Sequence, residues 1–352
     1  MGSAGKAAGG ERGTTRLAGR QAGGRRAGTM FAKAAGPPAL DAYAQAVMLC
    51  FDLAAAGPGA QREMLYRAQG FCEEQETGPA GWSLALRLLC QTQDARTAFH
   101  CLQVLQRKLE DPQQWAALRK TGDNLSIRLT LLQRDVSADP RFVRTKLGVV
   151  LALFIKREFP GEWPSAFDDV LATLSRGEVA ADVLLWTLVA LEEEVISVAG
   201  PEATEIKDAM RVDAVRKLVQ ALIHLFVTVG DSDQDLARRS LNILGSMISW
   251  ADINLVVENS SFISVVLDRL SRPNYASTVL HFFSCLVLKG MPPLAKASLI
   301  ANLGLADVVV AMSSALPRNE LRVSAPHLSA PLAVEAWARL KSHGNQLEAR
   351  YR

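Results

Sequence analysis

The sequence predicts an all-α protein, an α-solenoid in which HEAT-like helical hairpins stack into a superhelix. From about residue 39, apolar side chains recur at helical spacing, and no alternating run bounded by hairpin turns indicates strands. Helix-breaking motifs return at short, regular intervals, as expected for arrays with a period of roughly 40 residues. Roughly seven hairpins of that period would fit between residues 39 and 316. A compact helical bundle is the alternative, but many one-faced helices with short links favour an array.

Residues 1–38 are predicted to be a disordered, basic tail rich in Gly, Ala and Arg, because they contain too few large apolar side chains for a core. Residues 1–33 contain seven Lys and Arg against Glu11, a local charge of +6 within a total of +3, so the remainder of the chain is at −3. Three interpretations stay open: that the tail has no function, that translation starts at Met30, or that the tail is an organellar transit peptide.

Ten breaks divide the rest of the chain into predicted helices or closely spaced helix pairs. They begin near residues 57, 78, 111, 139, 160, 175, 200, 230, 273 and 290. Gly and Pro at these positions interrupt helices because Gly has a high backbone entropy and Pro lacks the amide donor.

The segment 144–164 illustrates the predicted pattern of a helix, a tight corner and a second helix. One face of the first helix is apolar: Val143, Leu147, Val150, Leu151, Phe154 and Phe159. Four charged residues are expected off that face: Arg144, Lys156, Arg157 and Glu158. The chain must turn at Pro160, and Pro164 is expected at the first position of the next helix. Trp163 then fills the corner between the two helices.

The sequence contains none of the motifs that would indicate a phosphate-binding loop for nucleotides, the nucleophile elbow of a hydrolase or the zinc-binding helix of a metalloprotease. The five histidines, His100, His224, His281, His327 and His343, have no ligand partners at metal-binding spacing. The acidic run 191–195 is expected to be a solvated surface near a helix end. Five cysteines without a Cys-x-x-Cys pair are expected to be buried thiols. No apolar run approaches the roughly 20 residues that span a bilayer. We therefore expect a binding protein, with no enzymatic activity, cofactor, metal or membrane insertion.

Five segments, in order along the chain, resemble one known family. FVRTKLGVVLALFIKREFPGEWPSAFDDVL (142–171) is similar to the hallmark segment of nuclear exportins of the importin-β superfamily. The others narrow the resemblance to the amino-terminal portion of exportin-T, the tRNA-exporting family, in its plant-type form. They are FHCLQVLQRKL (99–109), VALEEEVISVAGPEATEIKDAMR (189–211), SWADINLVVENSSFISVVLDRL (249–270) and LKGMPPLAKASLI (288–300).

The resemblance implies a HEAT-repeat export receptor that binds the small GTPase Ran in its GTP form together with tRNA, contacts nuclear pore components and shuttles between nucleus and cytoplasm. It implies importin-β-like repeats over 39–137, which bind Ran, and exportin-type repeats over 138–310. Residues 311–352 follow no exportin pattern, so a truncated form is expected. The sequence departs from the family's motifs at Ala251 and Pro292. The alternatives are a HEAT scaffold that binds a protein without nucleotide control, and an organellar location if the tail is a transit peptide.

Two sets of residues are candidates for binding, because the second helix of each pair is expected to line the concave wall. The Ran-binding candidates are Arg96, His100, Gln103 and Arg107, which form one polar stripe, and Arg144 and Lys146. The tRNA-binding candidates are Lys207, Arg211 and Lys217, for contacts with phosphates. An ordinary solvated helix face is the alternative for the stripe, and an ion pair with a neighbouring repeat is the alternative for Arg144 and Lys146. Trp163 and Trp250 are assigned to folding, because no basic residues are expected close to them.

Overall fold

The structure is a computed structural model that describes residues 37–55, 62–78 and 80–305. Residues 1–36 of the predicted tail, with Met30 and the transit-peptide interpretation, and the divergent segment 311–352, with His327 and His343, lie outside these residues. Pro37 and Pro38, which the sequence assigns to the tail, instead begin the first described helix. The chain divides into two compact units, Met1–Val104 and Leu105–Arg352. This division falls inside one helix rather than at residue 137, so the predicted repeat boundaries remain a prediction.

The first unit consists of three helices and the beginning of a fourth. They are α2 (Pro37–Ala55), α3 (Arg62–Thr77), α4 (Gly81–Gln91) and the first turns of α5 (Ala95–Glu110). Helix α2 packs on α3 and α4, and α3 packs on α4. The core of this unit is built from fully buried side chains such as Tyr43, Leu84, Leu89 and Leu102.

The second unit is helical throughout its described part. After the end of α5 come α6 (Pro112–Thr121), α7 (Asn124–Gln133), α8 (Arg141–Glu158), α9 (Ala166–Ala172), η2 (Thr173–Arg176), α10 (Glu178–Leu191), η3 (Glu192–Ile196), α11 (Pro201–Ala209), η4 (Met210–Ala214), α12 (Val215–Val229), α13 (Gln234–Ile248), α14 (Asn254–Val257), α15 (Ser260–Leu270), α16 (Pro273–Leu288) and α17 (Pro293–Asn302). Here η2 is a 3-10 turn, and η3 and η4 are π-helical turns. No strand occurs in the described ranges, and none of their helices is long and apolar enough to cross a membrane.

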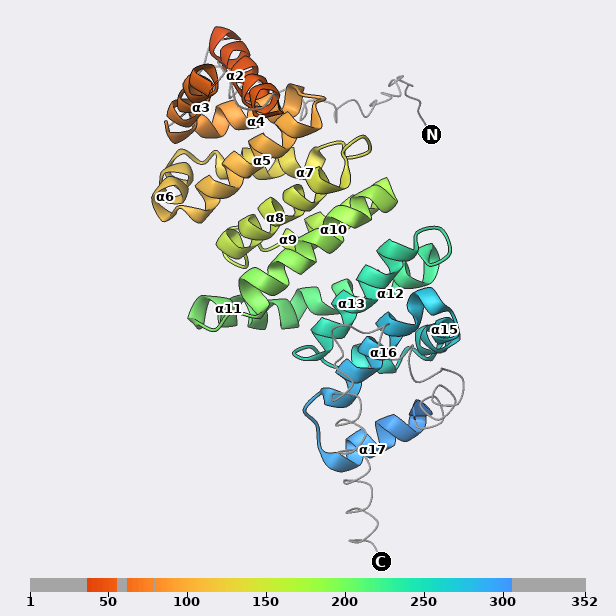
Figure 1. Cartoon of the computed structure of the whole chain (residues 1–352). Coiled ribbons are helices and arrows are strands. Elements are labelled where there is room, and N and C mark those ends of the chain that lie inside the picture. The colour runs from red at the N-terminus through yellow and green to blue at the C-terminus, as the bar shows by residue number, and fades with distance from the viewer. Residues whose placement is uncertain (1–36, 56–61, 79, 306–352) are drawn as a thin grey trace, which may run out of the picture. The chain divides into compact units, whose positions relative to one another are not determined.

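The helices of the second unit form two layers of stacked hairpins (Figure 1). In one layer α8 packs on α10, α10 on α13, and α13 on α16. In the other, α12 contacts both α9 and α15. Helices α8 and α10 of the first layer are parallel, because Arg144 and Asp182 join their beginnings while Lys156 and Glu194 join their ends. Each pair is 38 residues apart in sequence, which confirms the predicted period of roughly 40.

All ten predicted breaks lie at or beside a helix boundary, but the sequence pattern missed others. These follow Gln91, Thr121, Ile248 and Val257. The break after Thr121 has a clear physical cause, since Gly122 takes a left-handed conformation with φ of 73° at the end of α6.

The predicted apolar face of α8 is confirmed, with two corrections. All six apolar residues on it are buried. Glu158, however, is not solvated but only 2% exposed, because α8 is covered on several sides near its end. Pro164 does not begin the next helix either. Helix α9 begins at Ala166, and Pro164 lies in the preceding turn.

Helices α8 and α10 approach each other closely at Gly148. A Cβ atom at this position would lie 2.7 Å from the Cβ of Trp186 and 2.9 Å from the backbone nitrogen of Thr187. Real Cβ contacts are essentially never this short, so glycine is required here for the spacing of the two hairpins rather than for a special backbone conformation.

Candidate interaction surface

A chain of ion pairs, which we call the Asp182 ladder, joins three consecutive first-layer helices. Its members are Arg141 and Arg144 of α8, Asp182 and Trp186 of α10, and Asp235 and Arg239 of α13. Arg144 Nε donates to Asp182 Oδ2 at 2.6 Å, and Arg239 Nη1 lies 2.6 Å from Asp182 Oδ1. Asp182 is only 4% exposed. A buried carboxylate needs such partners, so the ladder fixes the register of the three helices.

The aromatic member of the ladder lies against two guanidinium groups. The Cζ atoms of Arg141 and Arg239 are 5.3 Å and 5.2 Å from the centre of the Trp186 ring. Cation–π contacts of this length stabilise the ring in place. The ladder therefore uses three arginines for contacts between hairpins.

A second buried ion pair explains the corner after α8. Arg128 Nη1 of α7 donates to Glu158 Oε2, and Asn124 Nδ2 donates to Glu158 Oε1 at 2.7 Å. The Arg128 guanidinium also stacks on the Trp163 ring, with 4.4 Å between its Cζ atom and the ring centre. The backbone nitrogen of Trp163 donates to the Glu158 carbonyl at 3.0 Å. Glu158 thus holds both the preceding hairpin and the corner.

Basic side chains from other helices bind the carbonyl groups at several helix ends. Arg157 donates to Leu109 and Glu110, and Arg176 to Leu132 and Arg134. The same arrangement recurs with Lys207 on Ile196 and Val198, Arg269 on Phe226 and Val227, and Lys289 on Ile248 and Ala251. The last carbonyls of a helix have no partner within that helix, so a cation there satisfies them and the helix dipole.

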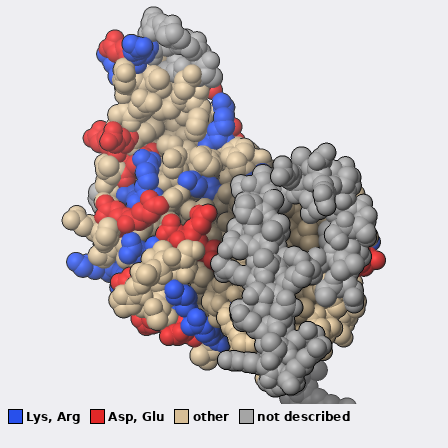
Figure 2. All heavy atoms as spheres, turned by 60° about the horizontal axis from the view of Figure 1, so that its bottom comes forward, with Lys and Arg blue, Asp and Glu red and all other residues tan. Residues whose placement is uncertain are grey.

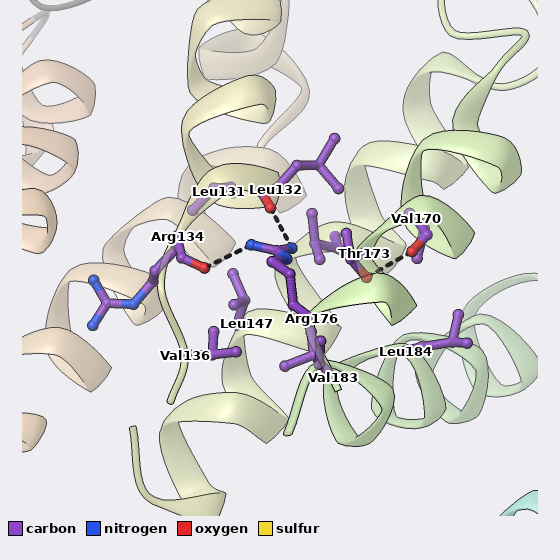
Figure 3. A pocket seen from close by; sticks show the side chains of 12 residues that line it. Leu131, Leu132, Arg134, Val136, Leu147, Val170, Thr173, Arg176, Val183 and Leu184 are labelled. Atoms are coloured by element: carbon purple, nitrogen blue, oxygen red, sulfur yellow. Dashed lines mark hydrogen bonds between the residues drawn. The ribbon is translucent and has the colours of Figure 1, made fainter. Parts of the chain in front are cut away.

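The recess around Arg176 is such a capping site and not a ligand pocket (Figure 3). The Arg176 guanidinium donates hydrogen bonds to the carbonyl of Leu132 at 2.6 Å and to the carbonyl of Arg134 at 3.1 Å. The walls are mostly apolar, from α7, α8 and α10, and the remaining space is about 10 Å³. That volume is at the lower limit for one water molecule.

In the first unit, two of the Ran-binding candidates on α5 have partners inside the protein. Arg96 pairs with Asp52 at 3.3 Å and Asp94 at 3.5 Å. His100 is half-buried rather than solvated, and its Nε2 lies 2.7 Å from Oε1 of the buried Glu76. Gln103 is exposed. The stripe is therefore less uniform than its spacing suggests, because α3 covers part of it.

Glu76 is the centre of a small polar network in the core of the first unit. Besides His100, it binds the hydroxyl of the fully buried Tyr43, which donates to Oε1 at 3.0 Å. Burial, together with the nearby Glu76 carboxylate, raises the pKa of Tyr43 well above its usual range. Tyr43 therefore stays protonated and acts as a donor.

In the second unit, Arg107 is exposed. Arg144 belongs to the Asp182 ladder, where it forms the ion pair with a neighbouring repeat that is one of the two alternatives from the sequence. Lys146 Nζ donates to Gln106 Oε1 at 2.5 Å, so it too reaches the preceding helix. Burial lowers the pKa of Lys146, and the positive charge of Arg107 acts in the same direction.

The three tRNA-binding candidates all have internal partners. Lys207 caps the end of η3, as described above. Arg211 pairs with Asp208 and donates to the Trp250 carbonyl at 3.3 Å. Lys217 binds Asp168 at 2.8 Å and Asp213 at 3.0 Å, and hydrogen bonds to these two carboxylates, Asp168 first, raise its pKa. A phosphate would have to compete with these groups.

Basic residues lie beside both corner tryptophans, which corrects the expectation from sequence. Arg128 stacks on Trp163, and the Arg211 Cζ atom lies 5.8 Å from the centre of the Trp250 ring. The sequence could not show this because Arg128 and Arg211 are 35 and 39 residues away from their rings. Trp163 is 1% exposed, so its assignment to folding stands.

The remaining expectations concern cysteines and acidic residues. Cys72 and Cys101 are buried, but Cys50 and Cys285 are half-buried and Cys90 is exposed, so burial was wrong as a general rule. Burial raises the pKa of Cys72 to about 12, which keeps it an unreactive thiol. The acidic run forms the π-helical turn η3 at the end of α10, where Lys156 pairs with Glu194 at 2.7 Å.

Charges of both signs are interspersed on the face of the protein that Figure 2 shows, and Lys and Arg do not gather there in one continuous patch. Nucleic-acid-binding surfaces usually concentrate cations on one face or stripe. Within the described ranges, no three His, Cys, Asp or Glu side chains are placed to hold a metal ion.

Comparison with known proteins shows similarity to exportins. The family described as Exportin 1-like protein matches residues 140–286, from α8 to α16. The chain is 28% identical to Exportin-T of Dictyostelium discoideum over 282 residues, which cover 77% of this chain and 25% of that protein. It is 29% identical to Exportin-T of Oryza sativa subsp. japonica over 320 residues, which cover 84% of this chain and 31% of that protein.

A third relative, Exportin-T of Arabidopsis thaliana, is 27% identical over 292 residues, covering 76% of this chain and 29% of the relative. The chain thus spans about a quarter to a third of the length of these relatives. The matches include the first unit as well as the stacked hairpins, and they agree with the all-helical array. The chain is therefore similar to exportins over most of its length, and it resembles exportin-T over a part of that protein's length.

Proposed function

We propose that this chain takes part in nuclear export of tRNA as a receptor that acts with Ran in its GTP form and shuttles between nucleus and cytoplasm. The observation that carries the proposal is the similarity to exportin-T across both units, which agrees with the stack of helical hairpins in the second unit. The GTP hydrolysis belongs to Ran, so the chain itself needs no catalytic group or cofactor. Nuclear pore components are the third class of partner in this proposal.

We place Ran on the polar side chains of α5 and α8. The stripe Arg96, His100, Gln103 and Arg107 supplies cations and an amide, and Arg144 and Lys146 come from the beginning of α8. Charged rim residues mainly set the association rate and the choice of partner, so the pairs that Arg96 already makes do not prevent such a role.

The first prediction is that the purified chain retains Ran loaded with a non-hydrolysable GTP analogue and not Ran loaded with GDP. The reason is that an export receptor must bind the two forms with different affinity. Pull-down with both forms measures the difference. Gln103→Ala together with Arg107→Ala should weaken retention, with Gln133→Ala, an exposed residue on α7, as the matched control. Equal retention of both Ran forms would contradict the proposal.

The second prediction concerns the tRNA-binding candidates. If Lys217 binds a phosphate, Asp168→Asn together with Asp213→Asn should strengthen tRNA binding, because these carboxylates hold the Lys217 ammonium. Lys217→Ala should lower the slope of log affinity against log salt by roughly 0.7–0.9. Filter binding of tRNA over a salt series measures both effects. Unchanged slopes in Lys217→Ala, and likewise in Lys207→Ala and Arg211→Ala, would remove these residues from the tRNA site.

A second candidate function is a HEAT scaffold that binds a protein partner without nucleotide control. The specific observation in its favour is that the basic side chains expected to bind tRNA are engaged in caps and ion pairs. The pull-down separates the two functions, because a scaffold would not distinguish the GTP and GDP forms of Ran.

A further inference from the structure

A polar cleft lies between α12 and the α14–α15 corner of the second unit. It is wide open to solvent and has a volume of about 380 Å³, far more than the recess around Arg176. The buried Val219 and the half-buried Leu255 contribute apolar atoms to its lining, and Asn259 caps α15 by accepting from the Phe262 backbone nitrogen. Six further exposed polar side chains complete the lining: Arg216, Gln220, Asn254, Glu258, Ser260 and Ser261.

The six polar side chains of this cleft do not bind one another. Among the described residues, none of the six makes a side-chain hydrogen bond or ion pair, although they come from α12, α15 and the corner around α14. Arg216 and Glu258 carry opposite charges and line the same cleft, yet in this described part of the chain they do not form a salt bridge. The cleft therefore offers donors and acceptors that are free to bind a ligand.

Arg216 differs from most other cations of this unit, and it shares the lack of a described side-chain partner with the exposed Lys120 of α6. The arginines of the Asp182 ladder, the capping side chains and Lys217 all bind carboxylates or carbonyls. Within residues 122–305, Arg216 and Lys296 are the two cations whose side chains bind no described residue. Lys296 lies on α17, outside the cleft. An arginine without such a partner beside a hollow is placed to bind a carboxylate of another molecule.

The chemistry of the cleft fits a polypeptide better than a nucleic acid. The amides of Gln220 and Asn254 each present a donor and an acceptor, which matches the alternating N–H and C=O groups of an extended main chain. Ser260 and Ser261 can likewise donate or accept. A row of phosphates, in contrast, would meet the Glu258 carboxylate in the same cleft as Arg216 and be repelled by it.

We propose that this cleft binds an extended segment of a partner polypeptide that carries an acidic side chain for Arg216 and a basic side chain for Glu258. The amides and hydroxyls of the cleft bind the main chain of the segment. This site goes beyond the proposed function, since it requires neither Ran nor tRNA.

The test starts from a phage-displayed library of random ten-residue peptides panned on the whole purified chain. Enriched peptides are synthesised with a fluorescent label, and their affinities are measured by anisotropy. Arg216→Glu should weaken binding by about tenfold, the size expected for the loss and reversal of one charge-assisted contact. Replacing the acidic residue of the peptide by Lys should restore binding to Arg216→Glu. Lys296→Glu is the matched control and should change the affinity less than about twofold.

Hydrogen exchange then locates the peptide, because amides of residues 254–261 should exchange more slowly when it is bound. Arg216 is exposed and its side chain binds no described residue, so Arg216→Glu should retain the helical content and melting temperature of the parent chain. The proposal is overturned if no peptide is enriched, or if enriched peptides bind Arg216→Glu and the parent chain equally. It is also overturned if a single-stranded RNA, and not the peptides, slows exchange of residues 254–261.

Discussion

Glu158→Gln is expected to lower the free energy of unfolding by about 3–5 kcal/mol, the cost of breaking a buried ion pair by removing one charge. The side chain of Glu158 is completely buried, and that of its partner Arg128 is only 9% exposed. The amide keeps the size of the carboxylate but leaves the Arg128 guanidinium without a counterion in a dry site. Urea denaturation followed by far-ultraviolet circular dichroism measures the effect.

The matched control is Glu162→Gln in the same corner. Glu162 also pairs with an arginine, Arg119, but both side chains are well exposed. An exposed pair of this kind contributes about 0–1 kcal/mol, so the two variants should differ clearly. Similar losses in both variants would show that the Glu158 site admits water and that its charge does not hold the corner.

Gly148→Ala is expected to destabilise the protein by about 1–3 kcal/mol, because the added methyl group overpacks the contact between α8 and α10. The neighbours are the Cβ of Trp186 and the backbone of α10, which cannot rotate away as the end of a flexible side chain can. The two helices must move apart, and this also strains the Asp182 ladder. Thermal unfolding followed by calorimetry should show a lower midpoint.

Gly70→Ala provides the control with the opposite expected sign. Gly70 also lies inside a helix, α3, but a Cβ atom there would have nothing within 4 Å. Alanine at an exposed helical position should stabilise the protein by roughly 0.5–1 kcal/mol through its lower backbone entropy. If Gly148→Ala also stabilised the protein, the close approach of α8 and α10 would be wrong.

The fold was predictable because it depends on local patterns. Periodic apolar residues such as Val143, Leu147 and Phe154 define helices, and Gly or Pro ends them. The unpredicted break after Ile248 has a different origin. The chain turns there within SWADIN (249–254), a segment that contains no Gly or Pro. Lys289 binds the carbonyls of Ile248 and Ala251 at this turn. That contact joins residues 41 and 38 positions apart and leaves no local signal.

The candidate site was harder to predict, because a basic residue looks the same in sequence whether it binds a partner or a helix end. Lys207, Arg211 and Lys217 are candidates because of their charge and their place in or near a family motif, yet each binds groups of its own chain. Glu158 is a similar case, since the sequence places it off the apolar face of its helix and its partner Arg128 is 30 residues away. Arg216 carries no sequence signal at all. Only the absence of a described partner beside an open cleft distinguishes it.

The cations that cap helix ends also have a mechanical consequence. Arg157, Arg176, Arg269 and Lys289 each reach back by 38 to 48 residues, so these four side chains tie hairpins to earlier ones by bonds at the edge of the stack. Opening the angle between two such hairpins stretches these bonds before it disturbs the apolar contacts. The stack should therefore resist bending. Its stiffness should depend less on ionic strength than the stiffness of a stack held together by exposed ion pairs, because salt screens exposed charges most strongly.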